Sequence, residues 1–211
     1  MAQIMNELKA KINGKNIPIV FPEGQDERIV AAVNRLAEES LLHPILIGPV
    51  KGEVHPNVEV IEPESYAGKE TMVEAFMERR KGKHTESEAR DLLKQQNYFG
   101  TMLVYQGLAK GLVSGAIQST GDTVRPALQI IKTKPGIQRA FGYFLMLRDD
   151  EKYLMADCAI NPNPTAEELA QFAVETGKIA SMYNIDPKVG MLSFSTDGSG
   201  VTDESIKVKK A

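Results

Sequence analysis

Short apolar runs alternate with helical patterns through the first half of the chain, and this alternation most constrains its fold. The run "IPIVFPEG" ends in turn residues, and "DERIVAAVNRLAEES" follows it with apolar residues at helical spacing. Two more strand-like runs, "HPILIGP" and "VEVIEP", end at a proline that a helix interior does not tolerate. Strands alternating with helices of this length predict parallel β–α–β units in a layered α/β fold.

Helical patterns follow in "KETMVEAFMERRKGK", "TESEARDLLKQQ" and "FGTMLVYQGLAKG", and we expect Gly111 to close the third helix. Thr85 and Glu88 have the spacing of a capping box. A predicted strand, "LVSGAIQ", then leads into a predicted helix, "DTVRPALQIIKT". We expect Asp122 to cap this helix and Pro126 to lie in its first turn, where proline is tolerated.

The pattern changes after Gly136. "RAFGYFLMLRDDEKYLMADCAI" predicts two antiparallel strands joined by a polar turn. A helix, "TAEELAQFAVETGKIASMYN", a strand, "KVGMLSF", and the start of another helix, "TDESIKVKK", come next. We predict a first α/β domain over residues 1–136 and the first half of a second over 137–211. The last helix has little apolar surface to bury, so we expect either a frayed end or an incomplete chain.

Composition excludes several classes of function. The net charge is -3, and the basic residues are scattered among acidic ones, so we expect no nucleic-acid partner. Cys158 is the single cysteine, which rules out an internal disulfide. The N-terminal segment lacks the apolar core of a signal peptide, and no window approaches the roughly 20 apolar residues of a membrane span. We therefore expect a cytoplasmic protein with no membrane partner.

Three predicted turns between a strand and a helix are rich in small polar residues: "PEGQDER", "QSTGDTVR" and "SFSTDGSG". Such turns meet at one edge of an α/β sheet, where helix N-termini present N–H groups to anions. Arg125, expected at the buried end of the second turn, has a planar guanidinium suited to phosphate or carboxylate. The pattern indicates an anionic ligand. The second turn offers Ser119, Thr120 and Gly121, and the third offers Ser195, Thr196, Ser199 and two glycines, Gly198 and Gly200.

Plainer interpretations stand beside this one. A turn of this composition is by itself more typical of a helix cap, and "ERRKG" of a solvated helix end. His43, His55 and His84 have no metal-ligand spacing and are expected at the surface, so no metal site is predicted. Cys158 is expected to be a small buried residue within a strand.

Four segments resemble the phosphate acetyltransferase family, also called phosphotransacetylase: "FPEGQDERIVAA", "SGAIQSTGDTVRPALQIIKTKPG", "MADCAINPNPTAEELA" and "VGMLSFSTDGSG". They occur in the family's order and span essentially the whole chain. The resemblance implies reversible transfer of an acetyl group between phosphate and coenzyme A, in acetate metabolism and acetyl-CoA biosynthesis. Coenzyme A, acetyl phosphate and phosphate would be substrates, with no bound cofactor. It also implies a two-domain fold with a cleft, similar to isocitrate and isopropylmalate dehydrogenases, and a homodimer.

The resemblance also implies roles for particular residues. Arg125 matches the arginine of the family's "VRPA" motif, and Arg80 that of its "RKxK" segment; both are associated there with coenzyme A or acetyl phosphate. The matching cleft-loop residues are Ser119, Thr120, Ser195, Thr196 and Gly198. The family's general base and its Ser-Arg pair lie beyond the point matched by Ala211, so we assign no catalytic residue. The first domain is accordingly expected to lack its C-terminal return segment.

Other functions stay open. A second enzyme function is that of the sister acyltransferase acting on butyryl phosphate, which differs in the size of its acyl pocket. A coenzyme A-binding fragment without turnover is a third possibility. A metal-dependent decarboxylating dehydrogenase of similar fold is disfavoured, because the sequence has no paired aspartates at ligand spacing and no adenine-binding signature.

We predict that the 211-residue chain alone has negligible acetyltransferase activity. Loss of a general base by itself commonly lowers the rate by about 10²–10⁴-fold. Thioester absorbance, followed with acetyl phosphate and coenzyme A, measures this activity. Turnover comparable with that of a longer family member would contradict the prediction.

Overall fold

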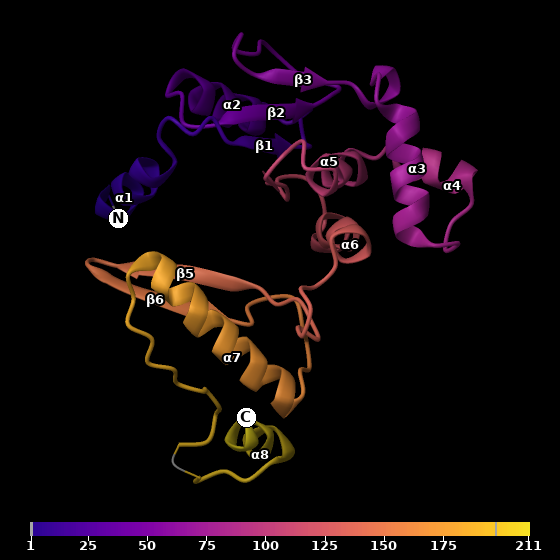
Figure 1. Ribbon diagram of the computed structural model, residues 1–211. Coiled ribbons are helices and arrows are strands. Elements are labelled where there is room, and N and C mark those ends of the chain that lie inside the picture. The colour runs from indigo at the N-terminus through magenta and orange to yellow at the C-terminus, as the bar shows by residue number, and fades with distance from the viewer. Residues whose placement is uncertain (1, 197) are drawn as a thin grey trace. The chain divides into compact units, whose positions relative to one another are not determined.

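The computed structural model describes residues 2–196 and 198–211 (Figure 1). The chain divides into two compact units, Ala2–Lys132 and Thr133–Ala211. Each unit has its own secondary structure.

A four-stranded parallel sheet forms the centre of the first unit, as the alternating pattern predicted. Its strands are β1 (Pro18–Phe21), β2 (His43–Ile47), β3 (Glu59–Ile61) and β4 (Gly111–Leu112), in the order β3-β2-β1-β4. The chain moves outward from β1 to β3 and then returns to the other side of β1. The direction of winding therefore reverses between β1 and β4, and ligands of open α/β sheets bind beside such a point.

Helices cover both faces of this sheet (Figure 1). Successive strand residues point to opposite faces, so Val20 and Ile45 pack in one apolar cluster and Phe21 and Leu46 in another. The first cluster includes residues of α3, α5 and α6, and the second residues of α2, which gives three layers. The helices are α1 (Ala2–Ile12), α2 (Glu27–Glu38), α3 (Lys69–Arg80), α4 (Glu86–Leu92), α5 (Gln96–Tyr105) and α6 (Thr120–Ile130).

Helix boundaries agree with the sequence at α4 and differ at α5. The predicted capping box of Thr85 and Glu88 is confirmed, with both hydrogen bonds formed at the start of α4. The prediction that Gly111 closes α5 is wrong, because this helix ends at Tyr105 and Gly111 begins β4. Gly107 has a φ of 79°, a left-handed conformation that stops a helix and that glycine adopts without strain.

Of the predicted strand "LVSGAIQ", only Leu112 lies in a strand, as the second residue of β4. The last backbone bond to β1 is donated by the Val113 N–H to the Val20 carbonyl at 2.9 Å. Beyond it, the buried carboxylate of Glu23 accepts four successive N–H groups. Gly115 and Ala116 donate to Oε2 at 2.9 and 3.0 Å, and the next two residues donate to Oε1 at 2.9 Å each. The strand ends here because the Glu23 side chain, and not a neighbouring strand, accepts the next backbone N–H groups.

The start of α6 also differs from expectation. Ser119 is the N-cap, and its Oγ accepts the Asp122 N–H at 3.1 Å; Asp122 is the third helical residue. Pro126 therefore lies in the second turn, where it removes the N–H that would reach the Asp122 carbonyl. The side chain of Asn97 on α5 donates from Nδ2 to that carbonyl at 3.2 Å instead. A neighbouring helix thus supplies the hydrogen bond that proline removes.

The described part of the second unit contains the predicted hairpin together with α-helices and a short 3-10 helix. β5 (Tyr143–Arg148) and β6 (Glu151–Ala156) pair antiparallel, and α7 (Ala166–Ala180) begins at a capping box of Thr165 and Glu168. A stacked pair, Phe141 and Phe172, has its ring centroids 4.9 Å apart. A short 3-10 helix, Ser181–Tyr183, follows α7, and α8 spans Asp203–Lys210. Among the described residues, no helix is long and apolar enough to cross a membrane.

Two predictions for this unit are wrong. The segment "KVGMLSF" forms no strand, since it pairs with neither strand of the hairpin, and Leu192 is 86% exposed. Cys158 lies after the end of β6, where it is half-buried, and is not a strand residue. The Asp157 carboxylate beside it accepts backbone N–H groups from Gly142 and Asn161, at 3.0 and 2.7 Å, so this segment turns instead of extending.

We predict that Gly100→Ala lowers the free energy of unfolding. A Cβ at Gly100 on α5 would lie 2.9 Å from Val20 Cγ1 and 2.8 Å from Leu112 Cδ1, so the helix packs tightly on the sheet there. Overpacking costs about 1–3 kcal/mol, against about 1 kcal/mol gained in helix propensity. Urea denaturation measures the net loss. Glu74→Ala, exposed on α3, should stay within about 0.5 kcal/mol of the unaltered chain. A gain in stability for Gly100→Ala would contradict the packing argument.

The contribution of Glu23 to the stability of the fold depends on pH. Burial, the largest single influence, raises the pKa of Glu23, but the four backbone donors outweigh it and leave the pKa below its ordinary value. The carboxylate therefore stabilises the fold fully above the ordinary pKa of about 4.3, and this contribution is lost as the pH falls through the lowered pKa. The stability advantage of the unaltered chain over Glu23→Gln, measured by denaturation between neutral pH and pH about 3, should shrink over that interval. A constant difference would refute this assignment.

Candidate functional site

The first two turns of α6 carry three of the predicted site residues: Ser119, Thr120 and Arg125. Ser119 Oγ donates to Asp122 Oδ2 at 2.6 Å, which completes the cap. Arg125 Nη1 lies 3.4 Å from Asp122 Oδ1, and the arginine side chain is 58% exposed. The expectation of an arginine at a buried end is therefore wrong. Such an exposed pair contributes little to stability, so the guanidinium remains accessible to an anion.

Arg80, the last residue of α3, lies close to the same helix. Its Nη1 donates to the Gln129 carbonyl of α6 at 3.1 Å. Tyr98 on α5 donates its hydroxyl to the Gln129 side chain at 2.9 Å. Burial raises the pKa of Tyr98, and the positive charges of Arg125 and Arg80 both oppose that increase. The structure thus brings both predicted arginines into the electrostatic surroundings of one tyrosine.

Arg79 was not singled out from the sequence. Its Nε and Nη2 donate to the carbonyls of Ile130 and Ile131, at 2.5 and 2.9 Å, and its guanidinium lies 5.3 Å from the centre of the Tyr105 ring. For Arg79 and Arg80 the interpretation of "ERRKG" as a purely solvated helix end is therefore wrong. The run of basic residues in "ERRKG" was the sequence feature that could have indicated Arg79. The positive charge of Arg79 has the largest effect in lowering the pKa of Lys132, and Lys83, Arg80 and Lys81 act in the same direction.

A cavity of about 520 Å³ lies at the carboxyl ends of the strands of the first unit. Gln25 and Gln96 pair across it through reciprocal amide bonds of 3.1 and 2.9 Å, and Gln96 also donates to the Gly48 carbonyl at 2.8 Å. Asp122, the partner of Arg125, lies on its wall. The cavity therefore adjoins the start of α6. Its lining residues include Gln25, Gly48, Glu62, Gln96, Asn97, Gln118 and Asp122.

The other predicted residues, Ser195, Thr196 and Gly198, belong to the second unit. Ser195 Oγ accepts the Gly200 N–H at 3.0 Å, and the Ser199 N–H donates to the Thr196 carbonyl at 3.0 Å. Gly198 has a φ of 86°, which a residue with a side chain rarely adopts. Asp197, in the same predicted turn, lies outside the described residues. These bonds make a polar loop ahead of α8 within the second unit.

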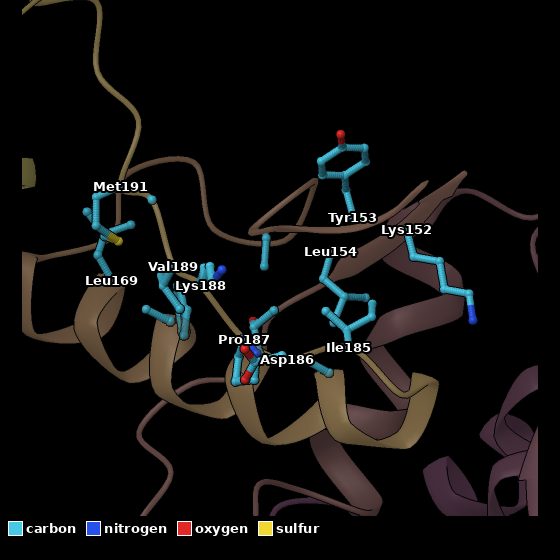
Figure 2. A pocket seen from close by; sticks show the side chains of 17 residues that line it. Lys152, Tyr153, Leu154, Leu169, Ile185, Asp186, Pro187, Lys188, Val189 and Met191 are labelled. Atoms are coloured by element: carbon cyan, nitrogen blue, oxygen red, sulfur yellow. The ribbon is translucent and has the colours of Figure 1, made fainter. Parts of the chain in front are cut away.

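A different cavity, of about 320 Å³, lies in the second unit (Figure 2). Leu154 and Ile185 line one part of it, and Leu169 and Met191 another. Residues of the segment predicted as a strand, 188–191, form part of its wall. None of the predicted site residues lines this mainly apolar cavity.

In the part of the chain that the structure describes, no group of three or more His, Cys, Asp or Glu side chains is placed to hold a metal ion. His43 Nε2 lies 2.9 Å from Glu59 Oε2, in a pair at the edge of the sheet. His84 packs against Phe76, with ring centroids 5.5 Å apart, and its Nδ1 lies 3.4 Å from Arg80 Nε.

Comparison with known proteins places this geometry in a family. Residues 3–211 match a family model described as phosphate acetyl/butaryl transferase. The phosphate acetyltransferases of Bacillus subtilis (strain 168) and Staphylococcus aureus (strain Mu50) are each 51% identical to this chain, over 221 and 220 residues. The matches cover 100% of this chain, and 68% and 67% of those proteins. The chain therefore spans about two thirds of the length of these relatives.

Solved structures agree with the sequence comparison. A phosphotransacetylase from Streptococcus pyogenes superposes with a TM-score of 0.90 at 51% identity, covering 100% of this chain and 67% of that one. A phosphotransacetylase from Staphylococcus aureus gives a TM-score of 0.86 at 49% identity, covering 99% and 66%. The parallel sheet and its helices are thus those of known phosphotransacetylases. With residues 3–211 matched and about half of them identical to those of its relatives, the chain belongs to the phosphate acetyl/butaryl transferase family.

Proposed function

We propose that this protein acts in the reversible transfer of an acetyl group between acetyl phosphate and coenzyme A. The reaction is acetyl-CoA + phosphate = acetyl phosphate + CoA. One observation carries the proposal: 51% identity to a phosphate acetyltransferase extends over the entire chain. That range includes every segment on which a substrate-binding role was predicted.

Arg80 and Arg125 are the proposed anion-binding residues. Acetyl phosphate and coenzyme A are both anionic, and guanidinium groups bind phosphate through parallel charge-assisted hydrogen bonds. Arg125 is paired with the exposed carboxylate of Asp122, an interaction weak enough for a substrate phosphate to displace. The other proposed binding residues are Ser119, Thr120, Ser195, Thr196 and Gly198.

The chemistry requires more than substrate binding. The thiol of coenzyme A must lose its proton before it attacks the carbonyl carbon, and the tetrahedral oxyanion needs hydrogen-bond donors. Phosphate then leaves as the thioester forms. Acetyl phosphate is already an activated acyl donor, so the proposed part of the described residues is to hold and orient the two anions. We propose no general base among them.

Several finer properties belong to the same proposal. We propose two domains, 1–136 and 137–211, with a substrate cleft between them, as in isocitrate and isopropylmalate dehydrogenases. A homodimer, a cytoplasmic location and a role in acetate metabolism and acetyl-CoA biosynthesis complete it. The relatives named phosphate acetyltransferase support the reaction. The domains, cleft, homodimer, location and metabolic role rest on the family resemblance.

Transfer of a butyryl group is the second candidate reaction, because the matching family model covers both acyl groups. The two reactions differ in the room they need for the acyl chain. Because the 211-residue chain is predicted to turn over neither substrate, calorimetry with acetyl phosphate and with butyryl phosphate separates them by affinity. Binding of coenzyme A without turnover, the outcome predicted for this chain alone, would favour a purely binding role for it.

We predict that Arg125→Ala weakens binding of acetyl phosphate or coenzyme A by roughly 10–100-fold, because a hydrogen bond to a charged group is worth about 1.5–3 kcal/mol. Isothermal titration calorimetry of the 211-residue chain with each ligand measures the affinity. Arg35→Ala is a matched control: Arg35 on α2 is likewise exposed and paired with a carboxylate of its own helix region, Glu39. Its affinity should be unchanged.

The outcomes of that experiment are distinct. Equal affinities for Arg125→Ala and the unaltered chain would remove Arg125 from the site. Failure of the unaltered chain to bind either ligand would contradict the proposed function itself.

A further inference from the structure

The loop 113–119 joins β4 to α6, and Glu23 holds its backbone from the neighbouring strand end. Glu23 lies two residues after β1 and is fully buried. Each of its two carboxylate oxygens accepts two N–H groups, so residues 115–118 are all bonded to one side chain at 2.9–3.0 Å. Gly115 has a φ of 116°, which allows the chain to curl around the carboxylate.

Two other side chains hold the same loop. Arg28 on α2 donates from Nη2 to the Ala116 carbonyl at 3.0 Å. The buried Asn97 accepts the Ser114 hydroxyl at 2.9 Å and donates to the Asp122 carbonyl at 3.2 Å. Side chains therefore bind the loop at Ser114, just before the four amides, and at Ala116, among them. Asn97 also binds the first turn of α6 beyond the loop.

The Glu23 bonds end one residue before the proposed substrate-binding group. Gln118 is the last residue bonded, and Ser119, the N-cap of α6, follows it directly. Fixing the backbone at Gln118 fixes where Ser119 starts the helix, and α6 then carries Arg125 in its second turn. We infer that Glu23 is a positioning residue, which sets the place of Ser119, Thr120 and Arg125 for binding of an anionic substrate. This inference rests on the proposed function.

The arrangement also determines which donors an incoming phosphate meets. Four consecutive backbone N–H groups of one turn resemble the amide nests that bind phosphate in other proteins. Here the protein's own carboxylate occupies them. A phosphate reaching this turn is therefore left to the hydroxyl groups and the guanidinium of α6, whose positions depend on Glu23.

The glycine beside Glu23 supports the same interpretation. A Cβ at Gly24 would lie 2.5 Å from the Ile47 carbonyl oxygen and 3.2 Å from that of Pro49. The backbone after β1 is therefore pressed against the end of β2, which leaves Glu23 little freedom to move away from the loop. The carboxylate and the amides are held from both sides.

The test uses Glu23→Gln in the 211-residue chain. The amide keeps the size of the carboxyl group, but its NH₂ faces N–H donors, so two of the four bonds are lost. Hydrogen exchange by NMR should show reduced protection at residues 115–118. Calorimetry should show binding of acetyl phosphate or coenzyme A weakened about 10–100-fold, since misplacement by about 1 Å can have an effect of this size.

A matched control separates positioning from loss of stability. Val33 on α2 is fully buried in the cluster on the other face of the sheet. Val33→Ala should lower stability yet retain substrate affinity and the exchange protection of the loop. A chemical rescue adds a second readout: Glu23→Ala leaves room for formate, and added formate should restore affinity in this variant but not in Arg125→Ala.

Each result decides the inference. Reduced loop protection with unchanged affinity in Glu23→Gln would overturn it and leave the proposed function standing. Equal loss of affinity in Val33→Ala would also overturn it, by showing that stability alone explains the effect. Should Glu23→Gln fail to fold, Glu23→Asp, which withdraws the carboxylate by one methylene, decides by the same measurements. If the unaltered chain binds neither ligand, the proposed function fails and the inference falls with it.

Discussion

The bonds between the Glu23 carboxylate and four backbone amides are the interaction on which much of the first unit depends. They lie between β1 and β4, where the winding of the sheet reverses and where ligands of α/β proteins bind. A buried carboxylate is unfavourable unless hydrogen bonds satisfy it. Here the satisfied charge ends one strand, shapes a loop and sets the start of α6. Fold and candidate site therefore depend on the same group.

Helix α6 is held at both ends by other helices and loops. At its start, Asn97 and Ser119 satisfy backbone groups of the first turns. At its end, Arg79 and Arg80 donate to carbonyls that the helix itself leaves open. The arginine pair thus has a structural part besides any contact with substrate. A helix fixed in this way can present Arg125 from a constant position, although that side chain is itself exposed.

Local chemistry made much of the fold predictable. The Thr85 capping box and the hairpin after Gly136 depend on residues close in sequence, and both formed as expected. The errors have distant causes. No local pattern indicates that Glu23 would replace a strand for residues 115–118, 92 to 95 positions later. The segment around Leu192 has strand-like composition but pairs with no strand among the described residues. For the site, the composition of the turn indicated Arg125, and the resemblance added Arg80, while Tyr98 and Arg79 became apparent only from packing.

Pro126 and Asn97 form a further dependence across the fold. Proline removes one donor from α6, and an amide on α5 replaces it. Each residue leaves a group that the other satisfies. The amide of a buried asparagine needs a hydrogen-bond acceptor, and a proline in the second turn of a helix leaves one carbonyl without its usual donor. The two positions therefore act as one unit of sequence, although they are 29 residues apart. The substitutions acceptable at either position therefore depend on the residue at the other. Packing of α5 against α6 also completes the backbone hydrogen bonding of α6.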